Sequence, residues 1–314
     1  MASPPLDITR SINVALAEAS GIAETYAPIL KRQSGVSLTT VYSRDRNRAK
    51  AFADRFDIAR ATDDLSDLTD GVDAVLICTE PSRHVFLART CVDRGIPVLV
   101  EKPLSHSLEG VDDLIAACKR TGTLAGVVSQ WRFDPHLRRI RDKLRGADEP
   151  AVWAQVEVFK PCSREYFEAH GGWRLREGHV PLNQGIHWLD ILIWILGEPR
   201  EIRAYSETLR ASGNCRDFAA GMLVHESGTV STVIMSTGHK GVSRLTLRIL
   251  QRGKEFVFPA RLGPAFLTRF SCPSRVNHSK LVLQDFLAAV REGRPPAVSL
   301  EEGRMALKAA LAFL

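Results

Sequence analysis

The sequence lacks an apolar run long enough to cross a membrane. A membrane-spanning helix needs about 18 or more consecutive apolar residues, and the longest candidate, from Trp188 to Leu196, is interrupted by Asp190. The N-terminus has neither the basic start nor the apolar stretch of a signal peptide. We therefore expect a cytoplasmic protein without a membrane partner.

Paired cysteines and zinc-like histidine spacings are also missing. The six cysteines are scattered and form no Cys-x-x-Cys pair: Cys78, Cys91, Cys118, Cys162, Cys215 and Cys272. This pattern is typical of reduced, structural thiols in a reducing compartment, and it gives no reason to expect a metal site. There is no internal repeat or low-complexity segment, and a composition of 45% hydrophobic and 25% charged residues excludes a disordered or fibrous chain.

A strong charge of one sign is absent as well, because the formal net charge is only +6 over 314 residues. This excess fits either a solvated, arginine-rich surface, which we favour, or an anionic substrate or cofactor. The most basic stretch, 138–145, has apolar positions at 137, 140 and 144, which predict an amphipathic helix. It has no interleaved aromatic residues, so we expect no nucleic-acid partner.

The first 130 residues alternate short apolar strands with helices. Strands are predicted at 12–16, 37–42, 74–78, 97–100 and 124–128, and helices at 46–56, 83–94, 108–120 and up to Leu30. Wholly apolar strands separated by helices of about a dozen residues predict a parallel sheet buried on both faces. The expected fold of residues 1–130 is therefore α/β, a Rossmann-like, doubly wound dinucleotide-binding domain.

The pattern changes after Pro150. Strands are predicted at 152–159, 201–208, 219–225, 229–235, 244–250 and 255–258, and helices at 183–196, 278–291 and 300–313. Most of these strands follow one another without a helix, which predicts a mostly antiparallel, open sheet. Residues 131–314 are therefore expected to form an α+β domain for substrate binding and oligomerisation, whose closing helices can also pack on the first domain.

Polar residues follow the predicted strands of the first domain. Ligands of open α/β sheets bind at the carboxyl ends of the strands, where the sequence has the tripeptide Glu101-Lys102-Pro103 and the turn Thr79–His84. We favour a functional role for the tripeptide over a surface ion pair, because a lysine and a glutamate held by proline at the end of a buried strand are costly to keep there by accident. In the turn, Ser82 is a natural helix N-cap.

The helix predicted at 183–196 carries Asn183, His187 and Asp190 at spacings of four and three, which place them on one face. A histidine with an acid one turn away on an apolar helix is either a satisfied core pair or an acid–base centre. The spacing alone leaves both interpretations open.

Together these motifs resemble one known family. The segments Val98–Ser105, Thr79–His84 and Asn183–Asp190, with Arg132-Phe133 and Pro135 between them, are similar in order and separation to the Gfo/Idh/MocA oxidoreductases. The resemblance extends from about residue 12 to about residue 300. It implies a Rossmann domain followed by an α/β domain whose open sheet often joins subunits, so a homo-oligomer is expected.

The resemblance implies hydride transfer between a nicotinamide and a carbinol carbon of a sugar-like substrate. Lys102 matches the active-site lysine and His187 the catalytic histidine, while Asn183 stands where many members have an aspartate. A neutral His187 can accept the carbinol proton, a cationic Lys102 can stabilise the oxyanion, and Asn183 can orient the substrate. Asp190 is expected to orient the imidazole.

Further binding residues follow from the matched positions and from the strand ends. Those expected to hold the cofactor are Ser20, Gly21, Ile22, Ser43, Arg44, Thr79, His84, Glu101 and Lys102. Those expected to line the substrate pocket are Trp131, Arg132, Trp173 and His179, with Tyr166 as a further candidate.

The glycine fingerprint departs from the family pattern. The first β-to-α turn should carry Gly-x-Gly-x-x-Gly/Ala, but Glu18, Ser20 and Ala23 occupy these positions. Ser20 is acceptable if its hydroxyl donates to a phosphate, whereas Glu18 adds an anion beside the pyrophosphate. At an effective dielectric constant near 20, a like charge about 6 Å away costs about 2–3 kcal/mol per phosphate charge.

Other positions also depart from the pattern or bear on the cofactor. Glu80 replaces the usual proline after Thr79, and Gly178-His179-Val180 stands where a glycine-rich stretch usually precedes the catalytic helix. Ser43-Arg44, after the second strand, is typical of a site for the 2′-phosphate of NADP, although Arg44 is also explained as a charge opening the next helix.

Two main interpretations follow. In the first, which we favour, the protein is an oxidoreductase that uses NADP or NAD, prefers NADP, and turns Glu18 toward solvent. In the second, the fold has lost its nucleotide and catalyses acid–base chemistry as a lyase, isomerase or cyclase. A non-catalytic binding protein is a third interpretation.

Overall fold

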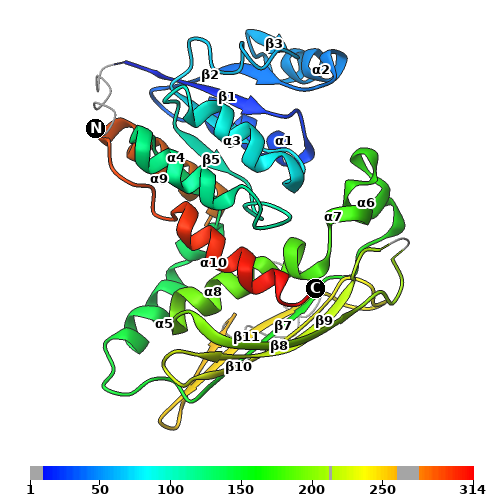
Figure 1. The fold of residues 1–314 in the computed structure, drawn as a ribbon, viewed down its shortest axis with the longest axis vertical. Helices are drawn as coiled ribbons and strands as arrows, with labels where there is room; N and C mark the ends of the chain where they lie inside the picture. Colours follow the sequence, from blue (N-terminus) through cyan, green and yellow to red (C-terminus); the bar gives the residue numbers. More distant parts are fainter. Residues whose placement is uncertain (1–9, 212–213, 260–275) are drawn as a thin grey trace. The chain divides into compact units, whose positions relative to one another are not determined.

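A computed structural model describes residues 10–211, 214–259 and 276–314 of the chain (Figure 1). Contacts divide the chain into two compact units. The first extends to Val128 and resumes from Asn277 to Arg304, and the second comprises Ser129–Val276 and Met305–Leu314. In the described part of the chain, no helix is long and apolar enough to cross a membrane.

The first unit contains a parallel six-stranded sheet in the order β3-β2-β1-β4-β5-β6. Its strands are β1 (Ile12–Ala17), β2 (Val36–Tyr42), β3 (Arg60–Thr62), β4 (Ala74–Ile77), β5 (Val98–Val100) and β6 (Ala125–Val127). All residues of β4 and β5 are buried, as expected for strands covered on both faces. The predicted Rossmann-like fold is confirmed, with β3 as an additional strand.

Helices connect these strands: α1 (Gly21–Lys31), α2 (Arg46–Phe56), α3 (His84–Val92) and α4 (Val111–Thr121). Ser20 caps α1 and Asp45 caps α2 through their side chains. The later helix α9 (His278–Glu292) belongs to this unit and packs against α1. From β1 the chain adds β2 and β3 on one side of the sheet, and then β4, β5 and β6 on the other. The topological switch point therefore lies between β1 and β4, which is where ligands of doubly wound sheets bind.

The second unit contains a six-stranded sheet in the order β12-β11-β7-β10-β9-β8. Its strands are β7 (Trp153–Phe159), β8 (Pro199–Glu207), β9 (Phe218–His225), β10 (Val230–Ser236), β11 (Arg244–Gln251) and β12 (Lys254–Phe258). The β7–β10 pair is parallel and the other pairs are antiparallel. The sheet is therefore mostly antiparallel, as predicted.

Helices of the second unit include α5 (Pro135–Arg145), α6 (Arg164–Glu168), α7 (Trp173–Glu177) and α8 (Ile186–Leu196). The predicted helix 183–196 begins earlier, because a π-helical turn, Pro181–Gly185, leads directly into α8. Gly185 lies so close to the Met235 sulfur that a side chain there would collide with β10. The π-helical turn, which carries Asn183 and Gln184, therefore packs directly against β10. The last helix of the chain is α10 (Leu300–Leu311).

Candidate active site

The turn between β1 and α1 lies at the switch point of the first sheet. The amides of Gly21 and Ile22 in the first turn of α1 have no partner within the helix, so they can bind an anion. The Ser20 hydroxyl donates to the carbonyl of Cys78 at 2.6 Å and accepts from the amide of Ala23 at 3.4 Å. The hydroxyl proton of Ser20 therefore bonds the turn to the residue after β4. In this structure it is not available for the phosphate to which the sequence interpretation assigned it.

Glu18 is buried, so the expectation that it faces solvent is wrong. Only 4% of the residue is exposed, and its carboxylate accepts a hydrogen bond from the Ser43 hydroxyl. The guanidinium groups of Arg44 and Arg48 lie 3.9 and 3.7 Å from its oxygens. These contacts place the carboxylate at the carboxyl end of β2 and surround it with positive charge, which offsets the repulsion anticipated from the sequence.

Arg44 also forms an ion pair with Glu80, from the segment after β4, at 2.6 Å. The Thr79 hydroxyl donates to the same carboxylate at 2.6 Å. Burial raises the pKa of Glu80, but the hydrogen bond from Thr79 and the charge of Arg44 outweigh burial, so that the net shift is downward. Glu80 is therefore the anionic partner of a predicted cofactor residue, Arg44.

His84, which was expected to hold the cofactor, lies in the protein interior instead. Its Nδ1 is 2.8 Å from the Pro103 carbonyl and its Nε2 is 3.0 Å from the Thr79 carbonyl. The residue is 1% exposed, so the imidazole connects the segments that follow β4 and β5. This is a positioning role, because it fixes the backbone on both sides of the switch point.

Glu101 is also buried, which excludes a surface ion pair at the end of β5. Its carboxylate accepts hydrogen bonds from the Tyr26 hydroxyl and from the Lys102 amide, the latter at 3.0 Å. Burial raises the pKa of Glu101, and burial followed by the nearby Glu101 charge raises that of Tyr26. These bonds anchor the backbone of Lys102, whose side chain is half-buried.

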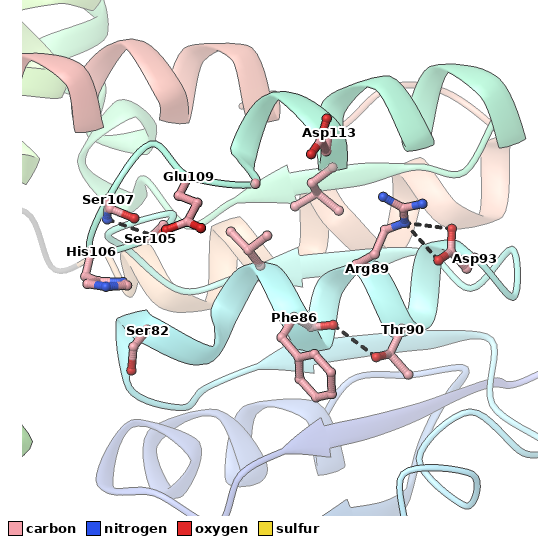
Figure 2. Close-up of a pocket in the computed structure, with 13 residues that line it drawn as sticks. Ser82, Phe86, Arg89, Thr90, Asp93, Ser105, His106, Ser107, Glu109 and Asp113 are labelled. Atoms are coloured by element: carbon pink, nitrogen blue, oxygen red, sulfur yellow. Dashed lines mark hydrogen bonds and ion pairs between the residues drawn. The ribbon is translucent and has the colours of Figure 1, made fainter.

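A separate groove of about 530 Å³ opens between α3 and α4 (Figure 2). On its α3 side, Arg89 pairs with Asp93 at 2.8 Å and Thr90 donates to the Phe86 carbonyl at 3.0 Å, so these polar groups are bonded within the helix. The residues expected to bind cofactor or substrate do not line it in the described structure. We therefore do not assign the reaction to this groove.

In the second unit, Asp190 forms a buried ion pair with Arg132. The guanidinium reaches both carboxylate oxygens, at 2.6 and 2.9 Å, and the Ser129 hydroxyl donates to one of them. Asp190 and Arg132 are 4% and 3% exposed. This corrects the expected pocket-lining role of Arg132 and gives Asp190 a structural role, joining α8 to the segment before α5.

Trp131 packs into an aromatic cluster. Its ring centroid lies 5.3 Å from that of Trp188 and 6.0 Å from that of Phe258. These contacts support the core of the second unit, so the geometry gives Trp131 a packing role in addition to the substrate contact predicted for it.

A hydrogen-bonded array lies on the turn that leads into α8. The Tyr166 hydroxyl accepts hydrogen bonds from the side-chain amide nitrogens of Asn183 at 2.8 Å and Gln184 at 3.2 Å. The Lys160 ammonium donates to the side-chain oxygen of Gln184 at 3.3 Å. Because the Tyr166 oxygen already accepts two bonds, its own proton can be donated to a ligand. His187 follows one turn after Asn183 and is half-buried.

Trp173 and His179, which were predicted to line the substrate pocket, lie near this array. The guanidinium of Arg174 stacks over the rings of Trp173 and Tyr166, at 4.6 and 4.4 Å. His179 Nδ1 accepts from the Arg216 amide at 3.0 Å, which leaves its Nε2 as the donor. Burial, followed by the charge of Arg216, lowers the pKa of His179 and favours this neutral form.

Sequence reasoning missed Arg48, Lys160 and the connection between Asn183 and Tyr166. Arg48 had a detectable signal, because the first turn of α2 contains basic residues and no acidic one. Cations are unfavourable at a helix N-terminus, so this turn indicated a nearby anion. No comparable signal identified Lys160, which follows β7 at a distance of 24 residues from Gln184.

Comparison with known proteins identifies both units. Residues 12–129 match the oxidoreductase family with an NAD-binding Rossmann fold, and residues 152–252 match the GFO/IDH/MocA C-terminal domain. The chain belongs to the Gfo/Idh/MocA family. The resemblance inferred from its motifs is thus confirmed, and the first unit is the NAD-binding domain of this oxidoreductase family.

Relatives of this Gfo/Idh/MocA protein extend over nearly its whole length. It is 24% identical to a 4-carboxy-2-hydroxymuconate-6-semialdehyde dehydrogenase from a Sphingobium species, covering 92% of this chain and 93% of the relative. It is 26% identical to the myo-inositol 2-dehydrogenase of Thermotoga maritima, covering 91% and 90%. The crystal structure of the Bordetella pertussis WlbA dehydrogenase with NADH and UDP-GlcNAcA has the same fold, with a TM-score of 0.83, 20% identity and coverage of 97% and 95%.

The residues of the first unit fit NAD. The first turn of α1 offers amides and a positive dipole end to a pyrophosphate. The buried Glu18 carboxylate, at the end of β2, is the type of acceptor that binds the hydroxyls of an adenosine ribose. The interpretation in which the fold has lost its nucleotide depended on an uncompensated Glu18, and the contacts of Arg44 and Arg48 remove that premise.

Proposed function

We propose that this protein is an NAD-dependent dehydrogenase of a polyhydroxylated, sugar-like alcohol. The observation that carries the proposal is the hydrogen-bonded array of Lys160, Gln184, Tyr166 and Asn183 beside His187. Its donors and acceptors come from the residue after β7, from α6 and from the turn before α8, and together they suit a substrate with several neighbouring hydroxyl groups. Relatives named for myo-inositol and D-apiose support this substrate class.

In the proposed reaction, the chain's own residues handle the proton and position the substrate. His187 accepts the carbinol proton, and Lys102 stabilises the negative charge that develops on the oxygen. Asn183 and Tyr166 hold neighbouring hydroxyls of the substrate. NAD⁺ supplies the hydride acceptor when it is bound.

The five described cysteines are all free thiols, which supports the reducing cytoplasm as the compartment.

A substrate panel tests the proposal. Purified protein is incubated with NAD⁺ and with myo-inositol, D-apiose and related aldoses and cyclitols, and NADH formation is followed by absorbance. We expect at least one polyol to be oxidised, with saturation in both NAD⁺ and the alcohol. Failure of every polyol, together with no binding of NADH in a fluorescence titration, would remove the proposed function.

We further propose that the second sheet joins two copies of the chain. On the face opposite its core-facing residues, Met222 pairs with Thr232 and Val224 with Val230, while Ile234 lies beside Glu157. Met222 is 37% exposed and Tyr205 61% exposed, which gives this face an apolar centre.

A single charged substitution tests the proposed dimer. We expect the wild-type chain to sediment as a homo-oligomer and Met222→Glu to sediment as a monomer, because the substitution buries an unpaired charge at the interface. Arg139→Glu, on the exposed side of α5, should leave the assembly unchanged. A wild-type monomer, or an unchanged Met222→Glu oligomer, would contradict this interface.

A further inference from the structure

The end of β2 presents the donor set of a phosphate site. The Ser43 hydroxyl and the guanidinium groups of Arg44 and Arg48 converge on one carboxylate. In Rossmann domains this location faces the adenosine ribose, and an arginine here is the usual partner of the 2′-phosphate of NADP. From the donors alone, the site would suit NADP.

The group that they bind is the carboxylate of Glu18, which comes from the turn after β1. The position of Glu18 is fixed by its backbone, because its amide donates to the Tyr42 carbonyl at 3.0 Å and its carbonyl accepts from the Ser20 amide at 3.0 Å. It has a left-handed φ of 91°, which non-glycine residues rarely adopt. The side chain is therefore held beside Ser43 by both the turn and its charged partners.

Arg44 is also held by a second internal carboxylate, that of Glu80. A 2′-phosphate would have to compete with Glu18 for Ser43, Arg44 and Arg48, and with Glu80 for Arg44. It would also approach two buried or half-buried negative charges. The unphosphorylated ribose of NAD meets none of this repulsion, and its hydroxyls can donate to the Glu18 carboxylate.

We infer that Glu18, at the first fingerprint position, is the residue that makes this dehydrogenase select NAD over NADP. It fills the anion site at the end of β2 with an internal carboxylate and offers that carboxylate to the ribose hydroxyls. In other Rossmann domains the discriminating acid follows β2 itself, where this chain has Ser43. The inference rests on the proposed NAD-dependent function and adds the origin of its cofactor preference.

Fluorescence titration with NADH and NADPH, without substrate, tests the inference. Wild-type protein is expected to bind NADH about 100-fold more tightly than NADPH. Glu18→Gln is expected to narrow this ratio about 10-fold or more, because it releases Ser43 and Arg48 from the carboxylate and leaves Arg44 with Glu80 as its one remaining anionic partner among the described contacts. Glu18→Gly is expected to narrow it similarly while relaxing the left-handed backbone, so it provides a second variant if glutamine disturbs folding. Glu24→Gln, which removes the exposed partner of Arg55 on α1, is the matched control and should leave the ratio unchanged.

The outcomes separate the inference from the function on which it rests. A wild-type protein that binds NADPH as tightly as NADH, or folded Glu18 variants that keep the wild-type ratio, would overturn the role of Glu18 while leaving the dehydrogenase intact. A wild-type protein that binds neither dinucleotide would overturn the proposed function and this inference together. Weakened NADPH binding in the Glu18→Gln variant would also contradict the inference.

Discussion

Replacing Lys102 or His187 with alanine is expected to lower kcat by about 10²–10⁴-fold, the usual contribution of a positioned acid or base. His187→Ala removes the acceptor of the carbinol proton, and Lys102→Ala removes the cation that stabilises the developing oxyanion. The measurement is the initial rate of NADH formation with the polyol that the wild-type enzyme oxidises. Circular dichroism and the NADH dissociation constant show whether each variant is folded and still binds the cofactor.

Matched controls distinguish chemistry from a loss of charge. His106→Ala and Lys50→Ala remove the same side-chain types from exposed positions of the first unit, so they should keep wild-type rates. If a folded Lys102→Ala or His187→Ala variant kept more than half of the wild-type kcat, the role assigned to that residue would be wrong.

The second large effect is on stability. Asp190→Ala is expected to lower the free energy of unfolding by about 3–5 kcal/mol, because it leaves the Arg132 guanidinium buried without its counter-ion. The two residues are almost completely buried, and the guanidinium bonds to both carboxylate oxygens. Urea unfolding followed by tryptophan fluorescence measures the change.

Two variants show whether the unpaired charge is the cause. The double variant Arg132→Met with Asp190→Leu removes both charges and should recover most of the lost stability. Asp93→Ala breaks an ion pair that is exposed on α3, and its effect should stay within about 1 kcal/mol. An Asp190→Ala variant as stable as the wild type would show that the buried pair contributes nothing.

Much of the fold could be predicted because the strands are short, apolar and regularly spaced. The parallel sheet of the first unit and the strands of the second lie close to the predicted ranges. The three-residue strand β3 was missed since Arg60–Thr62 has no apolar pattern, and the parallel β7–β10 pairing depends on contacts between distant segments. Local periodicity carries no information about such pairings.

The site was less predictable because partners of charged residues are chosen in three dimensions. Helical spacing placed Asp190 on the same face as His187, but both Asp190 oxygens bind Arg132 and Ser129. In the same way, Glu18 was judged by its own charge, whereas Ser43, Arg44 and Arg48 determine its environment. Residue type and spacing identified candidate site residues, but they did not indicate which charged groups neutralise each other.

Hydride transfer from a carbinol carbon to NAD can be followed with an isotope. NAD⁺ is reacted with a polyol substrate deuterated at the reacting carbon, and the reduced dinucleotide is analysed by mass spectrometry. We expect one deuterium in the dinucleotide for each carbonyl formed, and much less product when NADP⁺ replaces NAD⁺. Conversion of the polyol without reduction of the dinucleotide, or a reduced dinucleotide without deuterium, would contradict hydride transfer to NAD.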